Sequence, residues 1–343
     1  MVAKRLFIER PRYDLPKTSN GTRFEKWLME NGVLRKPNNG VDLGNLRAQA
    51  RVKIIFFGTQ GSIAGEQIEL DDKGVARKIE RKLGNNTVSV LVEIGEKVVI
   101  LDAGTGMKSV GKYLARKGVK DITVLISHKH WDHIQGIPFF DPLYDPKANI
   151  KFFGPNDEFE GTEVTVEQIL GQQLRVPFFP VQLREALSQR TYGRIEADQE
   201  YVDSIIEGVK IIARLNKHAR GTALSYRLEV DGFSLAYITD IQHTPDQLWE
   251  PALLQAQGAD IVIHDCQYDE DTDYVSTPFK RDWGHSTHRT AVELMRRTEA
   301  GLLVPFHLER EKDDAEIIRL EDRTRVDFPS TITSVEGMAI YVL

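Results

Sequence analysis

Three histidines and one aspartate lie in one short stretch, and these are the side chains of a metal site. The run SHKHWDH at 127–133 holds His128, His130, Asp132 and His133, and all nine histidines of the chain lie between residues 128 and 307. Neutral imidazole and carboxylate are the ligands that zinc and similar divalent ions prefer. A loop at this position can direct His128 and His130 to one ion, and Asp132 and His133 to a neighbouring one. We therefore interpret this spacing as a metal site rather than a polar loop.

The elements that must position these residues begin at residue 52. Apolar, β-branched stretches alternate there with helical patterns, and adjacent strands joined by tight turns predict mixed sheets in a layered α/β fold. Strands are expected at 52–57, 87–94, 97–103, 121–127, 149–154, 209–215, 224–230, 233–239, 259–265, 302–307 and 338–343. Helices are expected at 107–118, 245–258, 287–300 and 313–325, with a short helical pattern near 24–29.

The longer run SHKHWDHIQGIPFF at 127–140 resembles the signature of the metallo-β-lactamase superfamily, in particular its phosphodiesterase branch, which includes ribonuclease Z. Further segments match landmarks of that branch: FFGTQGS at 56–62, GNNT at 84–87, LDAGTG at 101–106, VPFFPVQL at 176–183, YITD at 237–240, HDCQY at 264–268 and WGHST at 283–287. The resemblance covers 52–343. It implies a four-layer αββα sandwich with two mixed β-sheets.

The resemblance also implies a cofactor of two divalent metal ions, zinc first, with manganese or iron as alternatives. The implied ligands are His128, His130 and His218 on one ion, Asp132, His133 and His307 on the other, and Asp240 between them. The stretch KHARGTALSY at 217–226 departs from the family pattern by one additional residue between histidine and tyrosine. Taken alone, Asp240 would be interpreted as a turn or helix-capping aspartate, and His307 as an ordinary residue at a strand end.

Residues near the implied ligands are expected to assist. His285 resembles the histidine that, in the ribonuclease Z branch, lies beside the metals and assists phosphate chemistry, although its segment could equally cap the following helix. Asp102, His264 and Asp265 are expected to support the ligands. His243 is left open between substrate contact and pocket lining. Cys266 is expected in the core and His288 on a solvated helix face.

The expected reaction is hydrolysis of a phosphodiester by a hydroxide formed between two metals. Asp132 would orient the water and accept a proton, and His285 would aid departure of the leaving oxygen. A cyclic nucleotide or other small phosphodiester is favoured, because 155–215 lacks the long glycine-rich, basic arm of a ribonuclease Z. The alternatives are a ribonuclease Z-like RNA endonuclease, a thioester or lactone hydrolase, and a non-catalytic metal-binding sensor domain.

Composition limits the class of protein. The chain has 343 residues and a net charge of −6. Residues 1–53 hold 12 Lys/Arg against 5 Asp/Glu, so they carry +7 and leave −13 on the rest. We expect a basic N-terminal extension at 1–51 and a hydrolase domain at 52–343. The basic segment leaves nucleic acid open as a partner.

Other features bear on location and assembly. No apolar run approaches the roughly 18 residues of a membrane span, and the first residues do not form a signal peptide. The single cysteine excludes an internal disulfide framework. A cytoplasmic protein without membrane association is therefore expected, and the family resemblance implies a homodimer.

Overall fold

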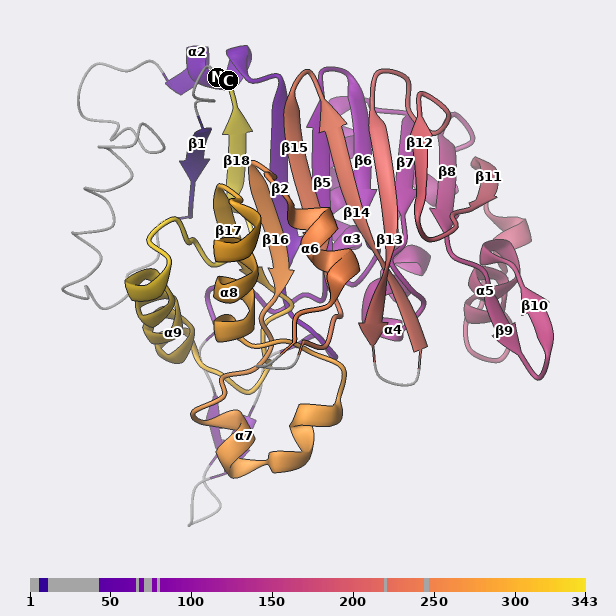
Figure 1. The fold of residues 1–343 in the computed structure, drawn as a ribbon. Coiled ribbons are helices and arrows are strands. Elements are labelled where there is room, and N and C mark those ends of the chain that lie inside the picture. Colours follow the sequence, from indigo (N-terminus) through magenta and orange to yellow (C-terminus); the bar gives the residue numbers. More distant parts are fainter. Residues whose placement is uncertain are drawn as a thin grey trace.

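Two mixed β-sheets form the centre of the computed structural model, which describes residues 6–11, 43–65, 68–70, 76–78, 81–218, 221–243 and 247–343 (Figure 1). The first sheet has eight strands in the order β1-β18-β2-β5-β6-β7-β8-β11. Their bounds are Leu6–Glu9 (β1), Ala339–Val342 (β18), Val52–Gly58 (β2), Ser89–Ile94 (β5), Lys97–Leu101 (β6), Asp121–Leu125 (β7), Asn149–Gly154 (β8) and Gln189–Arg194 (β11).

The second sheet has six strands in the order β12-β13-β14-β15-β16-β17. Their bounds are Gln199–Val202 (β12), Lys210–His218 (β13), Gly221–Val230 (β14), Phe233–Ile238 (β15), Ile261–Asp265 (β16) and Leu302–Phe306 (β17). Two small hairpins pair Ile68–Leu70 (β3) with Ala76–Lys78 (β4), and Asp157–Phe159 (β9) with Thr162–Val164 (β10). Strands β6, β7, β8 and β11 are parallel, as are β15, β16 and β17.

Helices follow many of these strands. The α-helices are Leu43–Gln49 (α2), Met107–Lys117 (α3), Trp131–Ile134 (α4), Val166–Gln173 (α5), Glu250–Ala256 (α6), Asp273–Ser276 (α7), His288–Thr298 (α8) and Asp314–Asp327 (α9). The 3-10 helices are Ile137–Phe139 (η1), Asp141–Tyr144 (η2), Leu183–Glu185 (η3) and Pro278–Asp282 (η4). The predicted helix at 245–258 corresponds to the shorter α6, Glu250–Ala256. Pro251 lies in its first turn, a position that proline favours.

Three apolar cores separate four layers, which confirms the expected αββα sandwich. The central core joins inward residues of both sheets, such as Val90 and Tyr226. A second core packs the outer face of the first sheet against α3 and α5, and a third packs the outer face of the second sheet against α6 and α8. Strands buried on both faces explain the continuous apolar stretches of the sequence.

The amino-terminal segment contributes to the first sheet. Strand β1 pairs antiparallel with β18, Leu6 lying opposite Val342. The first sheet thus includes residues on both sides of position 51, while the domain boundary itself stays a prediction. The helical pattern near 24–29 lies outside the described residues. Among the described residues, no helix has the length and apolar character to cross a membrane.

Candidate functional site

The predicted ligands lie where strands of both sheets end. His218 is the last residue of β13, Asp240 follows β15 and His307 follows β17. These three strands run in the same direction, since β14 is antiparallel to both β13 and β15, and β15 to β17 are parallel. The carboxyl ends of these three strands therefore lie at the same end of the second sheet. The loop after β7 brings His128 and His130 to the same place from the first sheet.

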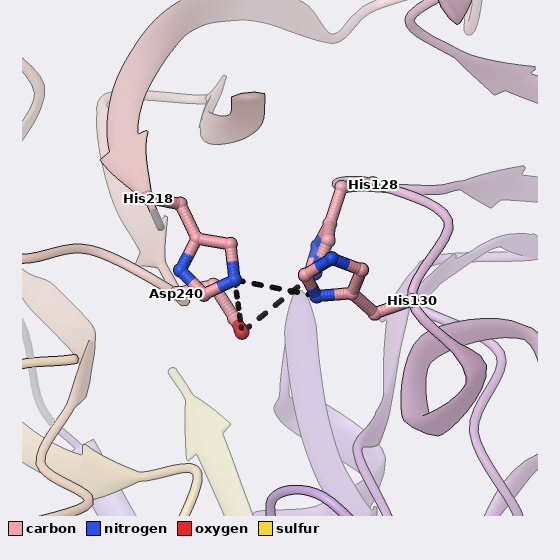
Figure 2. Close-up of side chains that lie close together, drawn as sticks. All are labelled: His128, His130, His218 and Asp240. Atoms are coloured by element: carbon pink, nitrogen blue, oxygen red, sulfur yellow. Dashed lines mark hydrogen bonds and ion pairs between the residues drawn. The ribbon is translucent and has the colours of Figure 1, made fainter. Parts of the chain in front are cut away.

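A first group of side chains consists of His128, His130, His218 and Asp240, whose ligand atoms all lie within 4.8 Å of one another (Figure 2). Nε2 of His128 and Nε2 of His218 each lie 3.7 Å from Asp240 Oδ1. His130 Nδ1 lies 3.3 Å from His218 Nε2. Three nitrogens and one carboxylate oxygen thus converge, and this donor set suits zinc or a similar divalent ion.

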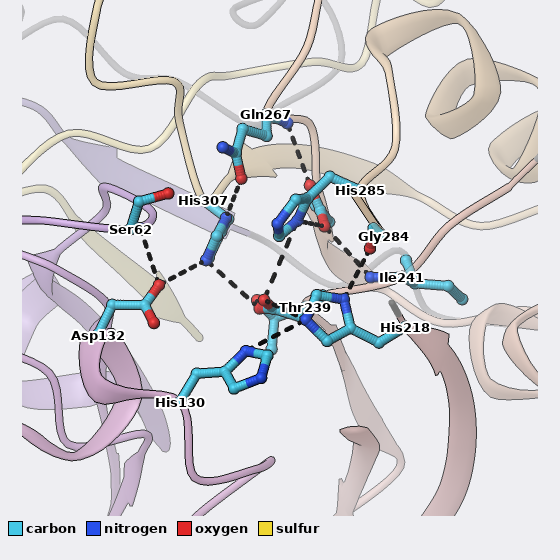
Figure 3. A network of polar contacts seen from close by, with 12 residues as sticks. Ser62, His130, Asp132, His218, Thr239, Ile241, Gln267, Gly284, His285 and His307 are labelled. Atoms are coloured by element: carbon cyan, nitrogen blue, oxygen red, sulfur yellow. Dashed lines mark hydrogen bonds and ion pairs between the residues drawn. The ribbon is translucent and has the colours of Figure 1, made fainter. Parts of the chain in front are cut away.

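A second group consists of Asp132, His133 and His307, of which Figure 3 labels Asp132 and His307. His307 Nε2 lies 3.2 Å from Asp132 Oδ2 and 3.3 Å from His133 Nε2. Asp240 reaches this group too, because its Oδ2 lies 3.1 Å from His133 Nε2 and 3.4 Å from His307 Nε2. One Asp240 oxygen faces the first group and the other faces the second, which is the arrangement of a carboxylate placed between two sites.

An independent observation also indicates that these side chains fit a metal ion. His128 Nε2 is buried and has no hydrogen-bond partner within the described part of the chain. A buried polar atom without a partner is costly, and an ion between His128 and Asp240 would remove that cost. Burial also lowers the pKa of His128, His130 and His218, which favours the neutral imidazoles that bind metals.

Carboxylates in the site stay ionised despite their burial. Burial opposes the ionisation of Asp240, but the imidazoles of His133 and His307 outweigh it and hold the carboxyl pKa well below its usual value. For Asp132, burial is likewise outweighed by His133 and His307, and the pKa is again well below the usual value. Burial opposes the protonation of His133 and His307, but the two carboxylates outweigh it and raise both imidazole pKa values, that of His307 to about 9. Both aspartates are therefore anionic at neutral pH, and an ion that bound the second group would displace a proton from these rings.

Four of the imidazoles at the site are held at Nδ1. The Nδ1 contacts are His133 with Asp102 Oδ2 at 2.9 Å, His218 with the Gly284 carbonyl at 2.8 Å, His307 with Gln267 Oε1 at 2.9 Å and His285 with Asp265 Oδ2 at 2.8 Å. Such bonds fix the ring and leave Nε2 free for a ligand. Gln267 is a residue that sequence reasoning missed, although it lies inside the HDCQY segment that carried the resemblance.

Asp102 confirms the expectation of a supporting carboxylate. Its Oδ2 accepts hydrogen bonds from the Tyr237 hydroxyl at 2.7 Å, the Ser127 hydroxyl at 2.8 Å and His133 Nδ1, while its Oδ1 accepts from the Ser127 amide at 2.7 Å. Asp102, Asp240 and His307 have positive φ angles of 57°, 51° and 56°. Such backbone strain at three site residues is typical of functional positions.

A loop after β2 packs against the second group. The Ser62 amide donates to Asp132 Oδ2 at 2.8 Å, which orients that carboxylate (Figure 3). A Cβ atom at Gly61 would lie 2.3 Å from Cε1 of the His307 ring. Glycine is required at Gly61 because the backbone passes directly against a site imidazole.

His285 lies beside both groups. It forms a third possible ligand group with Asp240 and His307, and its Nδ1 is 4.0 Å from Asp240 Oδ1. The shorter bond, however, joins this nitrogen to Asp265. Asp265 in turn accepts from the Ile241 amide at 3.2 Å and the Gln267 amide at 3.1 Å, so the expected supporting role of Asp265 is to hold His285.

His243 and His264 form a separate buried pair with 3.3 Å between their Nε2 atoms. His243 Nδ1 accepts from the Trp249 amide at 3.1 Å, and His264 Nδ1 donates to the Asp265 carbonyl at 2.7 Å. Of the two alternatives for His243, this pairing favours lining over substrate contact. Cys266 is buried in the apolar core, as expected, and burial raises the pKa of its thiol.

The prediction that His288 is solvated is wrong. His288 begins α8, but its side chain is 5% exposed because α9 covers it. The Thr324 hydroxyl donates to the Leu320 carbonyl, and His288 Nδ1 contacts the Thr324 oxygen at 3.0 Å. His288 Nδ1 is therefore the donor of that bond. Helical periodicity could not show this, because the covering helix lies more than 25 residues farther along the chain.

We expect the stability of the protein to fall in acid partly through His288. Burial lowers its pKa from 6.5 to about 3. Between these values the unfolded chain binds a proton that the folded chain does not, so the free energy of unfolding decreases as pH falls below 6.5. Urea unfolding from pH 6.5 to 5.0 gives the change in the free energy of unfolding per pH unit. This change should be smaller in His288→Gln than in wild type by about 1.4 kcal/mol per pH unit. Equal slopes would contradict this assignment.

Comparisons with known proteins agree with the fold. Residues 97–308 match the family model described as the beta-lactamase superfamily domain. Ribonuclease Z from Methanocaldococcus jannaschii is 22% identical over 311 residues, which cover 78% of this chain and 89% of the relative. Ribonuclease Z from Pyrococcus horikoshii is 22% identical over 290 residues, 75% of this chain and 86% of the relative.

Solved structures share the architecture. The metallo-beta-lactamase fold protein YhfI from Bacillus subtilis has a TM-score of 0.59 and 16% identity, covering 85% of this chain and 99% of its own. Human tRNase Z, short form, has a TM-score of 0.57 and 16% identity, with 85% and 99% coverage. A diphosphatase from the PhnP family has a TM-score of 0.56 and 19% identity, with 84% and 97% coverage.

Proposed function

The chain belongs to the beta-lactamase superfamily, and from that premise we propose that it is a metal-dependent phosphodiesterase. The observation that carries the proposal is the His285–Asp265 pair beside two convergent groups of metal ligands. The names of the relatives support the bond type, since they include ribonucleases Z and a diphosphatase. Divalent ions supply Lewis acidity toward phosphate oxygens and lower the pKa of water.

In this proposal, His128, His130 and His218 hold one ion, and Asp132, His133 and His307 hold a second. Asp240 would contribute to both, because its two oxygens face different groups. Zinc is the first candidate for this nitrogen-rich donor set, with manganese or iron as alternatives.

The chain's own residues then provide proton handling. Asp132 is anionic, and its Oδ2 is already engaged by the Ser62 amide, so its Oδ1 is suited to accept a proton from the attacking water. His285 donates Nδ1–H to Asp265, and as a doubly protonated imidazolium it would also carry on Nε2 the proton that passes to the leaving oxygen. Proton acceptance and proton donation need two groups on separate elements. Asp132 lies on α4, and His285 lies on the loop before α8.

A small phosphodiester remains the favoured substrate. In the structure, residues 155–215 form the β9–β10 hairpin, α5, η3, β11, β12 and the start of β13. These elements are short and hold no glycine-rich, basic tract, so this part of the chain lacks the long arm of that kind that a ribonuclease Z carries. Ribonuclease Z as the name of both archaeal relatives makes an RNA phosphodiester the second candidate.

The test is hydrolysis of bis(p-nitrophenyl) phosphate by protein freed of metal and reloaded separately with zinc and manganese. We expect turnover only after reloading. On a dinucleotide, whose alkoxide leaving group needs a proton, we also expect His285→Ala to lower kcat about 100-fold or more, with a much smaller loss on bis(p-nitrophenyl) phosphate, whose p-nitrophenolate leaves unprotonated. The metal content per chain should stay unchanged, because His285 is held by Asp265.

Each other outcome has a defined meaning. A reloaded protein that cleaves lactone or thioester substrates but no phosphodiester would replace the proposal with the thioester or lactone alternative. Bound metal without any turnover would favour a sensor domain. Loss of one ion per chain in His285→Ala would make His285 a ligand instead of a proton donor. His288→Gln serves as the matched control, since His288 lies on the same segment but contacts α9.

A further inference from the structure

His243 and His264 form a buried pair outside the two groups of ligand candidates. His264 is fully buried and His243 is 6% exposed. Their rings lie nearly parallel, with 22° between the planes and 5.4 Å between the centroids, and the two Nε2 atoms are 3.3 Å apart. Two neutral imidazoles can share a hydrogen bond only where one nitrogen carries a proton and the other does not.

Backbone groups decide which ring of the pair donates. The Trp249 amide can only donate, so His243 Nδ1 accepts and the proton of this ring lies on Nε2. The Asp265 carbonyl can only accept, so His264 Nδ1 carries the proton and its Nε2 accepts from His243. The hydrogen bonds therefore run in one direction, from Trp249 through both rings to Asp265. Burial lowers the pKa of both imidazoles, which agrees with two neutral rings.

These directions exclude a proton relay through the pair. A relay needs a final group that can take up the proton, and the last acceptor here is a peptide carbonyl oxygen, which only accepts hydrogen bonds. Each ring nitrogen of the pair also has its own partner, so neither imidazole needs a charge. The pair therefore acts by holding the backbone segments that it joins.

His264 lies where two neighbouring strands separate. Strand β15 pairs with β16 as far as Ile238, which lies opposite His264, and β15 ends there. On the other side of β16, Asp265 still pairs with Phe306 of β17. The hydrogen bond between His243 and His264 therefore joins the loop after β15 to the end of β16, directly beyond the last paired residues of these strands.

The carboxylate of Asp265 lies at this junction. Its Oδ2 accepts from His285 Nδ1 at 2.8 Å and from the Ile241 amide at 3.2 Å, and Figure 3 labels both donors. Ile241 lies two residues before His243, so the loop after β15 is bonded to both His264 and Asp265. A rotation of the peptide at residue 265 would move the carboxylate away from His285.

We propose that the His243–His264 pair positions His285. His243 fixes the tautomer of His264, His264 fixes the backbone at Asp265, and the carboxylate of Asp265 then holds His285 for proton delivery. The proposal rests on the proposed function and adds two positioning residues to it. It implies an effect on proton delivery and none on metal binding, because the outer bonds of the pair run to Trp249 and Asp265, and neither is a ligand candidate.

The test compares a dinucleotide with bis(p-nitrophenyl) phosphate on the metal-reloaded protein. In His264→Gln, the side-chain amide reaches the position of Nε2 and leaves the Asp265 carbonyl without its donor. We expect kcat on the dinucleotide to fall about tenfold or more, since the proton donor is displaced. Metal content and kcat on bis(p-nitrophenyl) phosphate should change little, because p-nitrophenolate leaves unprotonated. His264→Asn should recover most of the lost rate, because its amide lies at the place of Nδ1–H.

Two further variants separate positioning from a general loss of structure. His288→Gln is the matched control, since it changes another buried histidine whose hydrogen bond lies outside this network, and it should leave kcat on both substrates unchanged. In the double variant His264→Gln/His285→Ala, the loss on the dinucleotide should be no larger than in His285→Ala alone, because the pair acts only through His285.

Three results would overturn the inference: no loss on the dinucleotide or equal losses on both substrates in His264→Gln, loss of metal in that variant, or additive losses in the double variant. Failure of the reloaded wild type to cleave either substrate would instead count against the proposed function.

A second measurement tests the pair without turnover. Heteronuclear NMR of the full chain, isotope-labelled at histidine, distinguishes a ring protonated on Nδ1 from one protonated on Nε2. At neutral pH we expect His264 in the Nδ1–H form and His243 in the Nε2–H form, each signal being assigned by its loss in His264→Asn or His243→Gln. Either ring in the other form, or either ring as an imidazolium, would overturn the inference whatever the enzymatic result.

Discussion

Asp240→Ala is expected to abolish metal-dependent activity, with kcat lowered at least about 1,000-fold. The reason lies in the position of Asp240 between the two groups. Its Oδ1 faces His128 and His218 at 3.7 Å, and its Oδ2 faces His133 at 3.1 Å. Alanine removes an anionic donor from both groups at once. Metal content by mass spectrometry should fall by at least one ion per chain.

The matched control for this variant is Asp231→Asn. Asp231 lies in the exposed turn between β14 and β15 with a positive φ of 48°, which asparagine tolerates well. It should retain full activity and full metal content. Asp240→Ala protein that keeps all of its metal and most of its activity would show that Asp240 is a turn residue, and the dinuclear arrangement proposed here would be wrong.

Asp102→Ala is expected to destabilise the fold by about 3–5 kcal/mol. Asp102 is fully buried and accepts hydrogen bonds from Tyr237, from Ser127 and from the ligand candidate His133. Alanine leaves these donors without a partner in the interior and also removes a carboxylate from a position with positive φ. Urea unfolding of the metal-free protein measures this effect separately from any contribution of bound ions.

A second consequence of Asp102→Ala concerns the metal. Because His133 loses the carboxylate that holds its ring, metal affinity should fall about 10- to 100-fold. Tyr237→Phe is the control, since it removes one of the donors to Asp102 and leaves the His133 contact in place. It should cost about 1 kcal/mol. If Asp102→Ala lowers stability no more than Tyr237→Phe, the hydrogen-bond network around Asp102 is not an important source of stability.

The sequence permitted a detailed prediction of the fold because its signals are local. The apolar stretches at 121–127 and 233–239 overlap β7 and β15, and the pattern at 107–118 predicts α3 almost to the residue. The parts that were harder to predict depend on long-range contacts. The edge strand β1 is stabilised by β18, whose residues lie more than 300 positions away, and no periodicity in four residues indicates such a partner.

The candidate site residues also divide into those predicted from local signals and those that depend on long-range contacts. The types and spacing of His128, His130, Asp132 and His133 predicted a metal site from one segment, because a side chain's ability to bind a metal depends on its own chemistry. The loop after His218 departs by one residue from the family pattern, yet the structure places His218 within the first group. The direction of β13 decides where the His218 side chain lies. Because β13 and β15 run in the same direction, His218 lies at the same end of the sheet as Asp240, whatever the following loop does.

The sequence by itself therefore determined the ligand types, the strands and helices that carry them, and the family they resemble. Only the tertiary structure decided which of these residues contact one another and which are buried. It assigned Asp102 to His133, Gln267 to His307 and Asp265 to His285, and it buried His288 under α9. Hydrogen-bond partners and burial depend on side chains that approach from distant parts of the chain, and their direction is set by sheet order and strand twist rather than by neighbours in sequence.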